Sequence, residues 1–188
     1  MNAEGLIHFL CGDLKLSHEA QLALLDLIKE ESYGKSLDIQ KTGSTCKNIF
    51  FMSAGVARIY YWKEGVDITE HFAFEGQLII RAESLFTSQK TNKGIQSITA
   101  SQVLVIPAEG LFQLYGRFPE IESMFRRVFE KEWVNTIKRL ESFQMKTAKE
   151  RYLDLMKETE ILSIIPLKMV ASYLGITPES LSRIRSEL

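Results

Sequence analysis

The sequence lacks several features that would point to particular classes of protein. Two cysteines in 188 residues, Cys11 and Cys46, are too few for a disulfide framework and have no metal-ligand spacing. The three histidines, His8, His18 and His71, form none of the short motifs that hold catalytic metals. No apolar run approaches the roughly 20 residues of a membrane-spanning helix. A disulfide scaffold, metal catalysis and a membrane protein are therefore not predicted, and the cysteines are expected to be small buried or half-buried residues.

Charge and targeting signals are also sparse. The N-terminus has no basic or signal-like segment, which predicts a cytoplasmic protein. The net charge is -1, and the hydrophobic fraction of 45% is typical of a soluble chain with one ordinary domain and a small second one. From Lys146 to Leu188 there are seven basic and six acidic residues. If this region binds DNA, its basic side chains must be positioned toward the DNA, because they barely outnumber the acidic ones.

Short β segments dominate the first half of the sequence. A helix capped by Ser17 comes first and is expected to end near Gly34. Five segments rich in β-branched and aromatic residues then recur, with a glycine in nearly every turn: Asn48–Met52, Val56–Trp62, Asp67–Phe72, Gln96–Thr99 and Val103–Ile106. This spacing predicts an all-β roll or barrel. No helix-length pattern separates the strands, so a parallel α/β sheet is not expected.

The pattern turns helical after Pro107. A short helix is expected from Ala108 to Tyr115, and a long one opens at Pro119 and runs toward Met145. At about 25 residues the long helix is about 38 Å in length, which is more than a small domain covers. We therefore predict that its apolar stripe forms a homodimer interface, the alternative being a helix that lies wholly against its own roll. The stripe comprises Ile121, Met124, Phe125, Val128, Val134, Ile137 and Leu140.

A helix-turn-helix is predicted near the C-terminus. A capping box at residues 147–150 opens a preceding helix, and residues 159–166 form a connector. In the motif, small Ala171 allows a close helix crossing and Gly175 suits the positive φ of the turn. Thr177 is a strong N-cap for the second helix, with Pro178 at its first position.

The second helix of this motif has a polar outer face. Leu181 and Ile184 point inward, while Glu179, Ser180, Ser182, Arg183 and Ser186 point outward. An arginine in this position pairs bidentately with guanine. Arg185, about 200° around the helix from Arg183, should reach phosphate or an internal carboxylate. The alternative is a helical hairpin that serves only for packing.

Four segments together resemble the Crp/Fnr family of bacterial regulators. Residues 171–184, ASYLGITPESLSRI, are similar to its helix-turn-helix in the form common among Bacteroidetes. Residues 50–61, FFMSAGVARIYY, resemble its β-roll hairpin, and residues 72–77, FAFEGQ, resemble the strand that enters its ligand cassette. Residues 151–153, RYL, resemble the helix that follows its dimerisation helix. The resemblance covers nearly the whole chain in the right order.

The resemblance implies an α+β regulator rather than an enzyme. Residues 1–117 would form a β-roll sensor domain, a cyclic-nucleotide-binding-like double-stranded β-helix with flanking helices. Residues 118–146 would form the dimerisation helix and residues 147–188 the helix-turn-helix domain, with its wing absent or truncated. The implied partners are double-stranded DNA and a second copy of the chain, while a small-molecule effector and RNA polymerase stay open.

The resemblance also assigns DNA contacts. The recognition helix would begin at Thr177, with Glu179 and Arg183 matching the base-contacting positions of the family. Ser180 and Ser182 match backbone contacts, and Arg185 follows on the same helix. The family often has arginine where this chain has Pro178, so its operator is expected to differ.

The ligand cassette departs from the pattern of members that bind cyclic AMP. Those members carry Gly-Glu-Leu and then Arg-Ser, in which the arginine takes the cyclic phosphate. Here Thr91 and Asn92 fall at the Arg-Ser position, and neither carries a charge for a phosphate. The sequence thus predicts that cyclic AMP is not a tight ligand and that the cassette binds something else or nothing. A substitute pocket would draw on Arg81, Glu83 and Ser84, from another direction.

Other cofactors and functions would need residues in particular patterns. The oxygen-sensing branch of the family holds an iron–sulfur cluster on several N-terminal cysteines, which Cys11 alone does not supply. A cupin-like metal oxygenase needs two or three inward histidines, and only His71 lies on a predicted strand. A small-molecule-binding or protein-interaction module that does not bind DNA stays open. DNA binding measured across a salt series distinguishes such a module from a DNA-binding regulator.

Overall fold

The chain begins with two short helices that lie against the sheets. The computed structural model describes residues 1–158 and 160–188, so Thr159, the first residue of the expected connector, lies outside the described residues. Helix α1 spans Ala3–Cys11 and α2 spans His18–Leu27. The Ala20 N–H donates to Ser17 Oγ over 3.2 Å, which confirms Ser17 as the N-cap of α2.

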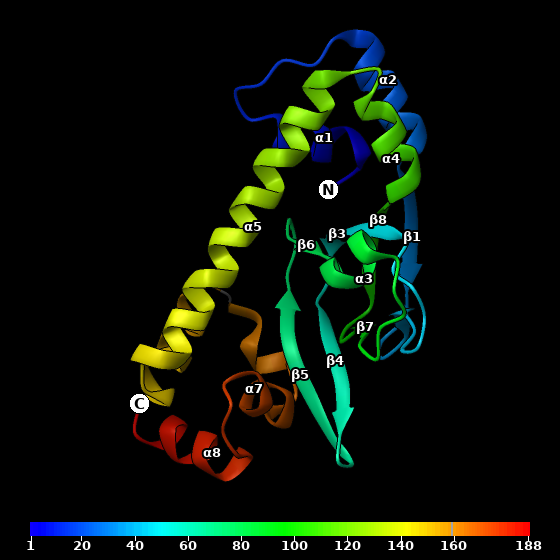
Figure 1. Cartoon of the computed structure of the whole chain (residues 1–188). Coiled ribbons are helices and arrows are strands. Elements are labelled where there is room, and N and C mark those ends of the chain that lie inside the picture. The colour runs from blue at the N-terminus through cyan, green and yellow to red at the C-terminus, as the bar shows by residue number, and fades with distance from the viewer. Residues whose placement is uncertain (159) are drawn as a thin grey trace.

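Two antiparallel four-stranded sheets follow, in the orders β1-β8-β3-β6 and β2-β7-β4-β5 (Figure 1). Their strands are β1 Lys29–Tyr33, β2 Asp38–Gln40, β3 Asn48–Ala54, β4 Ala57–Lys63, β5 Val66–Ala73, β6 Leu78–Ile79, β7 Gly94–Ser97 and β8 Ser101–Pro107. The roll predicted from the turn spacing is confirmed as this pair of sheets. Phe51, Met52 and Ile95 are fully buried in one hydrophobic core. Consecutive residues of β3 are buried, so both faces of this strand are covered, and residues of α1, α2 and the two helices that follow β8 belong to the same core.

Two predicted features of this region are wrong. The helix expected to reach Gly34 ends at Leu27, and Lys29–Tyr33 forms strand β1 instead, paired with β8. Between the strands lies a short helix, α3 (Ala82–Thr87), where no helix was expected. Strand β1 has four exposed residues in five, because it covers the edge of β8 and buries little of its own surface.

The long helix has two apolar faces. Helix α4 spans Ala108–Tyr115, and α5 spans Pro119–Met145, running beside the roll toward the C-terminal helices (Figure 1). Ile121, Met124 and Phe125 are each 0% exposed in the chain's own core. These three residues therefore offer no surface to a second copy, and assigning them to a dimer interface was wrong. Val128 is half-buried against the same core.

The exposed apolar residues of α5 lie farther along. Val134 is 47% exposed, Ile137 41% and Leu140 60%, and the unpredicted Trp133 is 67% exposed. At about 100° per residue, Ile137 lies about 160° around the helix from Ile121. The single stripe expected from the sequence is therefore two stripes on nearly opposite faces. The first completes the chain's own core, and the second is exposed.

Four further helices follow in the described part of the chain. They are α6 (Ala148–Glu158), the 3-10 helix η1 (Glu160–Ile164), α7 (Leu167–Tyr173) and α8 (Pro178–Ser186). The capping box at the start of α6 is confirmed, since the Thr147 N–H donates to Glu150 Oε2 over 2.7 Å and the Glu150 N–H to Thr147 Oγ1 over 3.3 Å. Among the described residues, no helix has both the length and the apolar character needed to span a bilayer.

Candidate nucleic-acid interface

The last two helices form a compact helix-turn-helix. Gly175, between α7 and α8, has φ +70°, and a Cβ at this position would lie 3.2 Å from Cε1 of Phe143. Both the left-handed backbone and the close approach favour glycine. Ala171 and Leu181 are fully buried at the crossing of the two helices. The turn predicted from these residues is confirmed.

Helix α8 begins with a capped N-terminus. The Ser180 N–H donates to Thr177 Oγ1 over 3.2 Å, and the Thr177 hydroxyl lies 3.2 Å from Ser180 Oγ. Pro178 occupies the first helical position, as predicted. A backbone hydrogen bond at Glu179 and one with Thr177 lower the pKa of the Glu179 carboxyl. The start of α8 is therefore a fixed element, with Glu179 ionised at its exposed edge.

The outer face of α8 is polar and exposed. Glu179, Ser182 and Arg183 are exposed, whereas Leu181 is buried and Ile184 half-buried. Among the described side chains, Arg183 forms no ion pair within 4.0 Å. Its exposed guanidinium is therefore accessible to an external acceptor.

Arg185 points the other way. Its Nε donates to Tyr152 Oη over 3.0 Å, and its guanidinium lies 5.6 Å from the centre of the Tyr152 ring. The sequence predicted a phosphate or an internal carboxylate as the partner, and the internal partner is a phenol on α6. The structure thus separates Arg183 from Arg185, although both were predicted to contact DNA.

The helix-turn-helix is docked on the edge of a sheet through residues that the sequence reasoning did not single out. Strand β5 is an edge strand of its sheet, and the Thr69 N–H at that edge donates to Ser172 Oγ of α7 over 2.9 Å. The rings of Phe72 and Tyr173 lie 4.8 Å apart, and the Arg139 guanidinium of α5 lies 3.8 Å from the centre of the Tyr173 ring. A serine that caps an edge strand relieves an unpaired N–H group. The contact spans 103 residues of sequence, so no local pattern reveals it.

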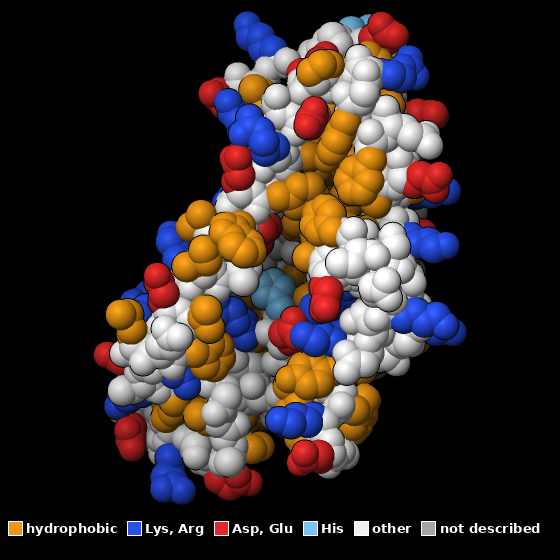
Figure 2. Space-filling model, in the orientation of Figure 1, with side chains coloured by type: hydrophobic (Ala, Val, Ile, Leu, Met, Phe, Trp, Pro, Cys, Tyr) orange, Lys and Arg blue, Asp and Glu red, His pale blue; other side chains and the backbone are white. Residues whose placement is uncertain are grey.

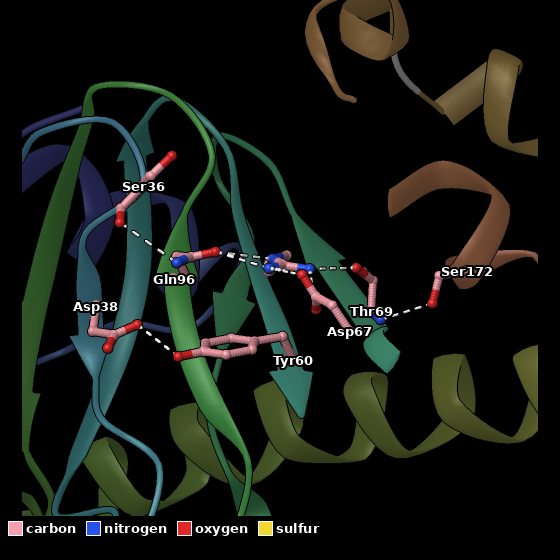
Figure 3. A network of polar contacts seen from close by, with 8 residues as sticks. Ser36, Asp38, Tyr60, Asp67, Thr69, Gln96 and Ser172 are labelled. Atoms are coloured by element: carbon pink, nitrogen blue, oxygen red, sulfur yellow. Dashed lines mark hydrogen bonds and ion pairs between the residues drawn. The ribbon is translucent and has the colours of Figure 1, made fainter. Parts of the chain in front are cut away.

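A polar network leads from this contact into the roll (Figure 3). Arg58, only 3% exposed, binds both carboxylate oxygens of Asp67 over 2.8 Å. It also donates to Thr69 Oγ1 over 2.9 Å and to Gln96 Oε1 over 3.1 Å. Thr69 therefore links a buried, bidentate ion pair to Ser172 on the helix-turn-helix.

A cavity of about 910 Å³ lies between the roll and α5 (Figure 2). Of the residues predicted for an effector pocket, Arg81 and Glu83 line it, but Ser84, Thr91 and Asn92 do not. Ser84 is buried instead, where its hydroxyl accepts the Cys46 N–H over 2.9 Å and donates to the Gln89 carbonyl. Only part of the predicted effector set therefore lies at this cavity.

Charge inside this cavity is predominantly acidic. Five glutamates and three arginines line it, together with the rings of Phe86, Phe112 and Phe129. Arg81 pairs with Glu70 over 2.8 Å rather than with Glu83, and Lys93 binds the other oxygen of Glu70. Burial raises the pKa of Glu70, but the Lys93 hydrogen bond and the Arg81 charge outweigh it and leave that pKa lowered.

Two neutral groups complete this cavity. Burial, followed by the charge of Glu122, raises the pKa of Tyr115, whose buried hydroxyl has no partner among the described residues. Burial, followed by the charge of Arg139, lowers the pKa of His71 to about 4. Both groups are uncharged near neutral pH.

The possible metal donors of the chain are scattered. No three His, Cys, Asp or Glu side chains gather in a metal-binding arrangement within the described part of the chain. Cys11 and Cys46 are free thiols, half-buried and buried respectively. This agrees with the small, packed cysteines predicted from the sequence.

Solved structures with a similar fold include proteins described as regulators. No protein-family model matches the sequence, and no curated protein matches it either. FixK2 of Bradyrhizobium japonicum is similar with a TM-score of 0.72 and 19% identity, covering 86% of this chain and 84% of that one. A putative Crp/Fnr regulator of Eubacterium rectale has a TM-score of 0.69, 18% identity and coverages of 92% and 83%. The c-di-GMP-responsive regulator CLP of Xanthomonas campestris has a TM-score of 0.67, 14% identity and 91% coverage of each chain. The chain therefore has the fold of Crp/Fnr regulators.

Proposed function

We propose that this chain is a homodimeric, sequence-specific DNA-binding transcription regulator of the Crp/Fnr type. In this proposal residues 1–117 form the sensor, 118–146 the dimerising element and 147–188 the DNA-binding part. The observation that carries it is the geometry of α8, with a capped start at Thr177, a buried Leu181 and an exposed Arg183. The shared fold supports the same assignment.

Residues of α8 have distinct roles in this proposal. Arg183 reads a guanine in the major groove, since its guanidinium is exposed and forms no ion pair among the described side chains. Glu179, at the exposed edge of the helix start, reads a neighbouring base by accepting a hydrogen bond from cytosine. Ser182 contacts the DNA backbone. Thr177 and Ser180 act mainly as the cap that fixes the angle of the helix, because their hydroxyls lie beside each other.

The sensor cavity is not a cyclic-nucleotide site in this proposal. A cyclic phosphate entering the cavity would meet five glutamates against three arginines. The Arg81 guanidinium already pairs with Glu70, so a ligand phosphate would have to compete with a half-buried carboxylate that Lys93 also binds. The attraction that a phosphate gains from Arg81 is therefore reduced by the ion pair that it must break. The aromatic lining suits an uncharged, largely apolar effector better.

The test compares two arginines on one helix. Arg183→Ala should remove most of the preference for a selected operator over a scrambled duplex. The ratio of the two affinities should fall by a factor of about 5 to 100 per half-site. Arg185→Ala should leave that discrimination intact and lower stability, because it removes the partner of Tyr152. Competition binding at fixed salt measures both variants against both duplexes. An Arg183→Ala variant that keeps the full operator preference contradicts the proposal.

A second candidate is a small-molecule or protein-interaction module that does not bind DNA. It is favoured by the tight docking of α7 on β5 and by the nearly balanced charge of residues 146–188. Binding of selected and random duplex DNA, measured across a salt series, separates the two candidates. DNA affinity that falls steeply with salt supports the regulator, whereas no binding to selected or random duplex supports the module.

A further inference from the structure

A second cavity has the opposite charge. This cleft of about 800 Å³ lies between the roll, α5 and the C-terminal helices, and seven basic and two acidic side chains line it. The basic residues are Arg127, Lys131, Lys138, Arg139, Lys146, Arg151 and Lys157, and the acidic ones are Glu132 and Asp154. A concave surface lined by one sign of charge concentrates ligands of the other sign. The cleft is therefore suited to an anion, unlike the predominantly acidic cavity described above.

Two lysines of α5 face the cleft without carboxylate partners. Lys131 and Lys138 are seven residues apart, which places them within about 20° of each other around the helix and about 10 Å apart along it. Both are exposed, and neither forms an ion pair within 4.0 Å among the described side chains. Lys146 and Lys157, in contrast, share Asp154 at 2.7 Å and 3.2 Å. The two unpaired ammonium groups lie on the surface of an elongated site.

An arginine on α6 is fixed at the same cleft. Arg151 donates to the Lys146 carbonyl over 2.6 Å and to the Leu174 carbonyl over 2.8 Å, and it stacks on the Phe143 ring at 4.8 Å. Its Nε is buried without a hydrogen-bond partner among the described residues. A buried donor of this kind costs free energy unless a ligand or water satisfies it. Cations from α5 and α6 thus converge on one space.

We propose that this cleft binds a small phosphorylated molecule with at least two phosphate groups. Phosphate oxygens accept hydrogen bonds from ammonium and guanidinium groups, and the cations of this cleft are distributed along α5 and α6 rather than gathered at one point, which matches a ligand with more than one phosphate. The volume falls within the range of small-molecule sites, about 300–1,000 Å³. Such a ligand would bridge α5 and α6 and hold the C-terminal helices against the roll. This proposal goes beyond the proposed function and does not depend on DNA binding.

Calorimetry on the full chain tests it, with inorganic tripolyphosphate and ATP as probes at two salt concentrations. The wild-type chain should bind one probe molecule, less tightly at high salt. Lys131→Glu/Lys138→Glu should lower the affinity at least ~10-fold, because two attractive charges become repulsive. Lys29→Glu/Lys63→Glu is the matched control, since both lysines are exposed, lie outside the cleft and give the same change in net charge.

A third variant distinguishes the two cavities. Arg126 lines only the predominantly acidic cavity and is exposed, so Arg126→Glu should leave probe binding in the cleft nearly unchanged. The proposal is overturned by any of three results: no binding of either probe at millimolar concentration, equal losses in the cleft and control doubles, or a loss confined to Arg126→Glu. A selective loss in Lys131→Glu/Lys138→Glu supports it, whatever the chain does with DNA.

Discussion

His71 lies on β5 at the floor of both cavities, with Glu70 beside it and with Arg81, Glu132 and Arg139 lining the same space. Its pKa is lowered to about 4, first by burial and then by the charge of Arg139. In the unfolded chain an ordinary histidine titrates near 6.5. Between pH 6.5 and 4 the unfolded chain therefore binds a proton that the folded chain does not.

This difference predicts a pH-dependent stability. The free energy of unfolding should fall as the pH drops from about 6.5 toward 4, by at most about 1.4 kcal/mol per pH unit from this group. Above pH 6.5 both states are neutral and the effect vanishes. Urea unfolding of the wild type and of His71→Gln at several pH values from 7.5 to 5 measures this effect. The free energy of unfolding should fall more steeply with decreasing pH in the wild type than in the variant. His18→Gln removes an exposed histidine as the control, and parallel curves for wild type and His71→Gln would contradict the assignment.

Residues whose role is local could be predicted from the sequence. The cap at Thr177 and the positive φ of Gly175 depend on neighbours within a few positions, and both are confirmed. The partners of Arg81 and Arg185 could not be predicted, because Glu70 and Tyr152 lie on other elements.

At the scale of elements, the contact between β5 and α7 is the structural link between roll and helix-turn-helix. It joins the Thr69 N–H to Ser172 Oγ at an edge strand and is backed by the buried Arg58 network (Figure 3). Ser172→Ala removes the acceptor and leaves the Thr69 N–H without a partner in the docked state. Losing one such hydrogen bond costs about 0.5–1.5 kcal/mol.

We expect Ser172→Ala to loosen this docking without unfolding α7 or the roll. Hydrogen exchange of the Thr69 amide should accelerate by about 2- to 13-fold, while amides of β3 and β8 in the other sheet keep their protection. Ser182→Ala, an exposed serine on the neighbouring helix, provides the matched control. An unchanged Thr69 exchange rate would show that the packing of Phe72 on Tyr173 holds the contact by itself.

Elements with a strong periodic pattern were predicted well, and those defined by pairing were not. The bounds of α4 were predicted to the residue, and α5 ends at Met145 as expected. Strand β1 was missed because Lys29–Tyr33 alternates no apolar residues and is a strand only through its pairing with β8. Sequence spacing also did not separate the two apolar faces of α5, since both carry the same residue types. Only the burial of Ile121 in the core of the chain distinguishes them.

For the whole molecule, the second face of α5 is the feature that requires a partner. Trp133, Val134, Ile137 and Leu140 are between 41% and 67% exposed in the chain. A contiguous apolar stripe of this kind on a soluble protein typically marks an interface. A second copy is the proposed occupant, because two such helices related by a two-fold axis would cover each other's stripes.

Dimerisation can be tested with two substitutions on opposite faces of α5. Light scattering should give twice the chain mass of 21.5 kDa for the wild type. Ile137→Glu places one carboxylate per copy in the interface, where burying an ion costs several kcal/mol, and should give monomers. Asn135→Glu adds the same charge about 200° away on the cleft face and should stay dimeric. Because the proposed operator has two half-sites about 34 Å apart, Ile137→Glu should also weaken operator binding far more than Asn135→Glu does. A wild type that is monomeric at tens of micromolar, or an Ile137→Glu chain that stays dimeric, would place the interface elsewhere and leave the exposed stripe without its proposed partner.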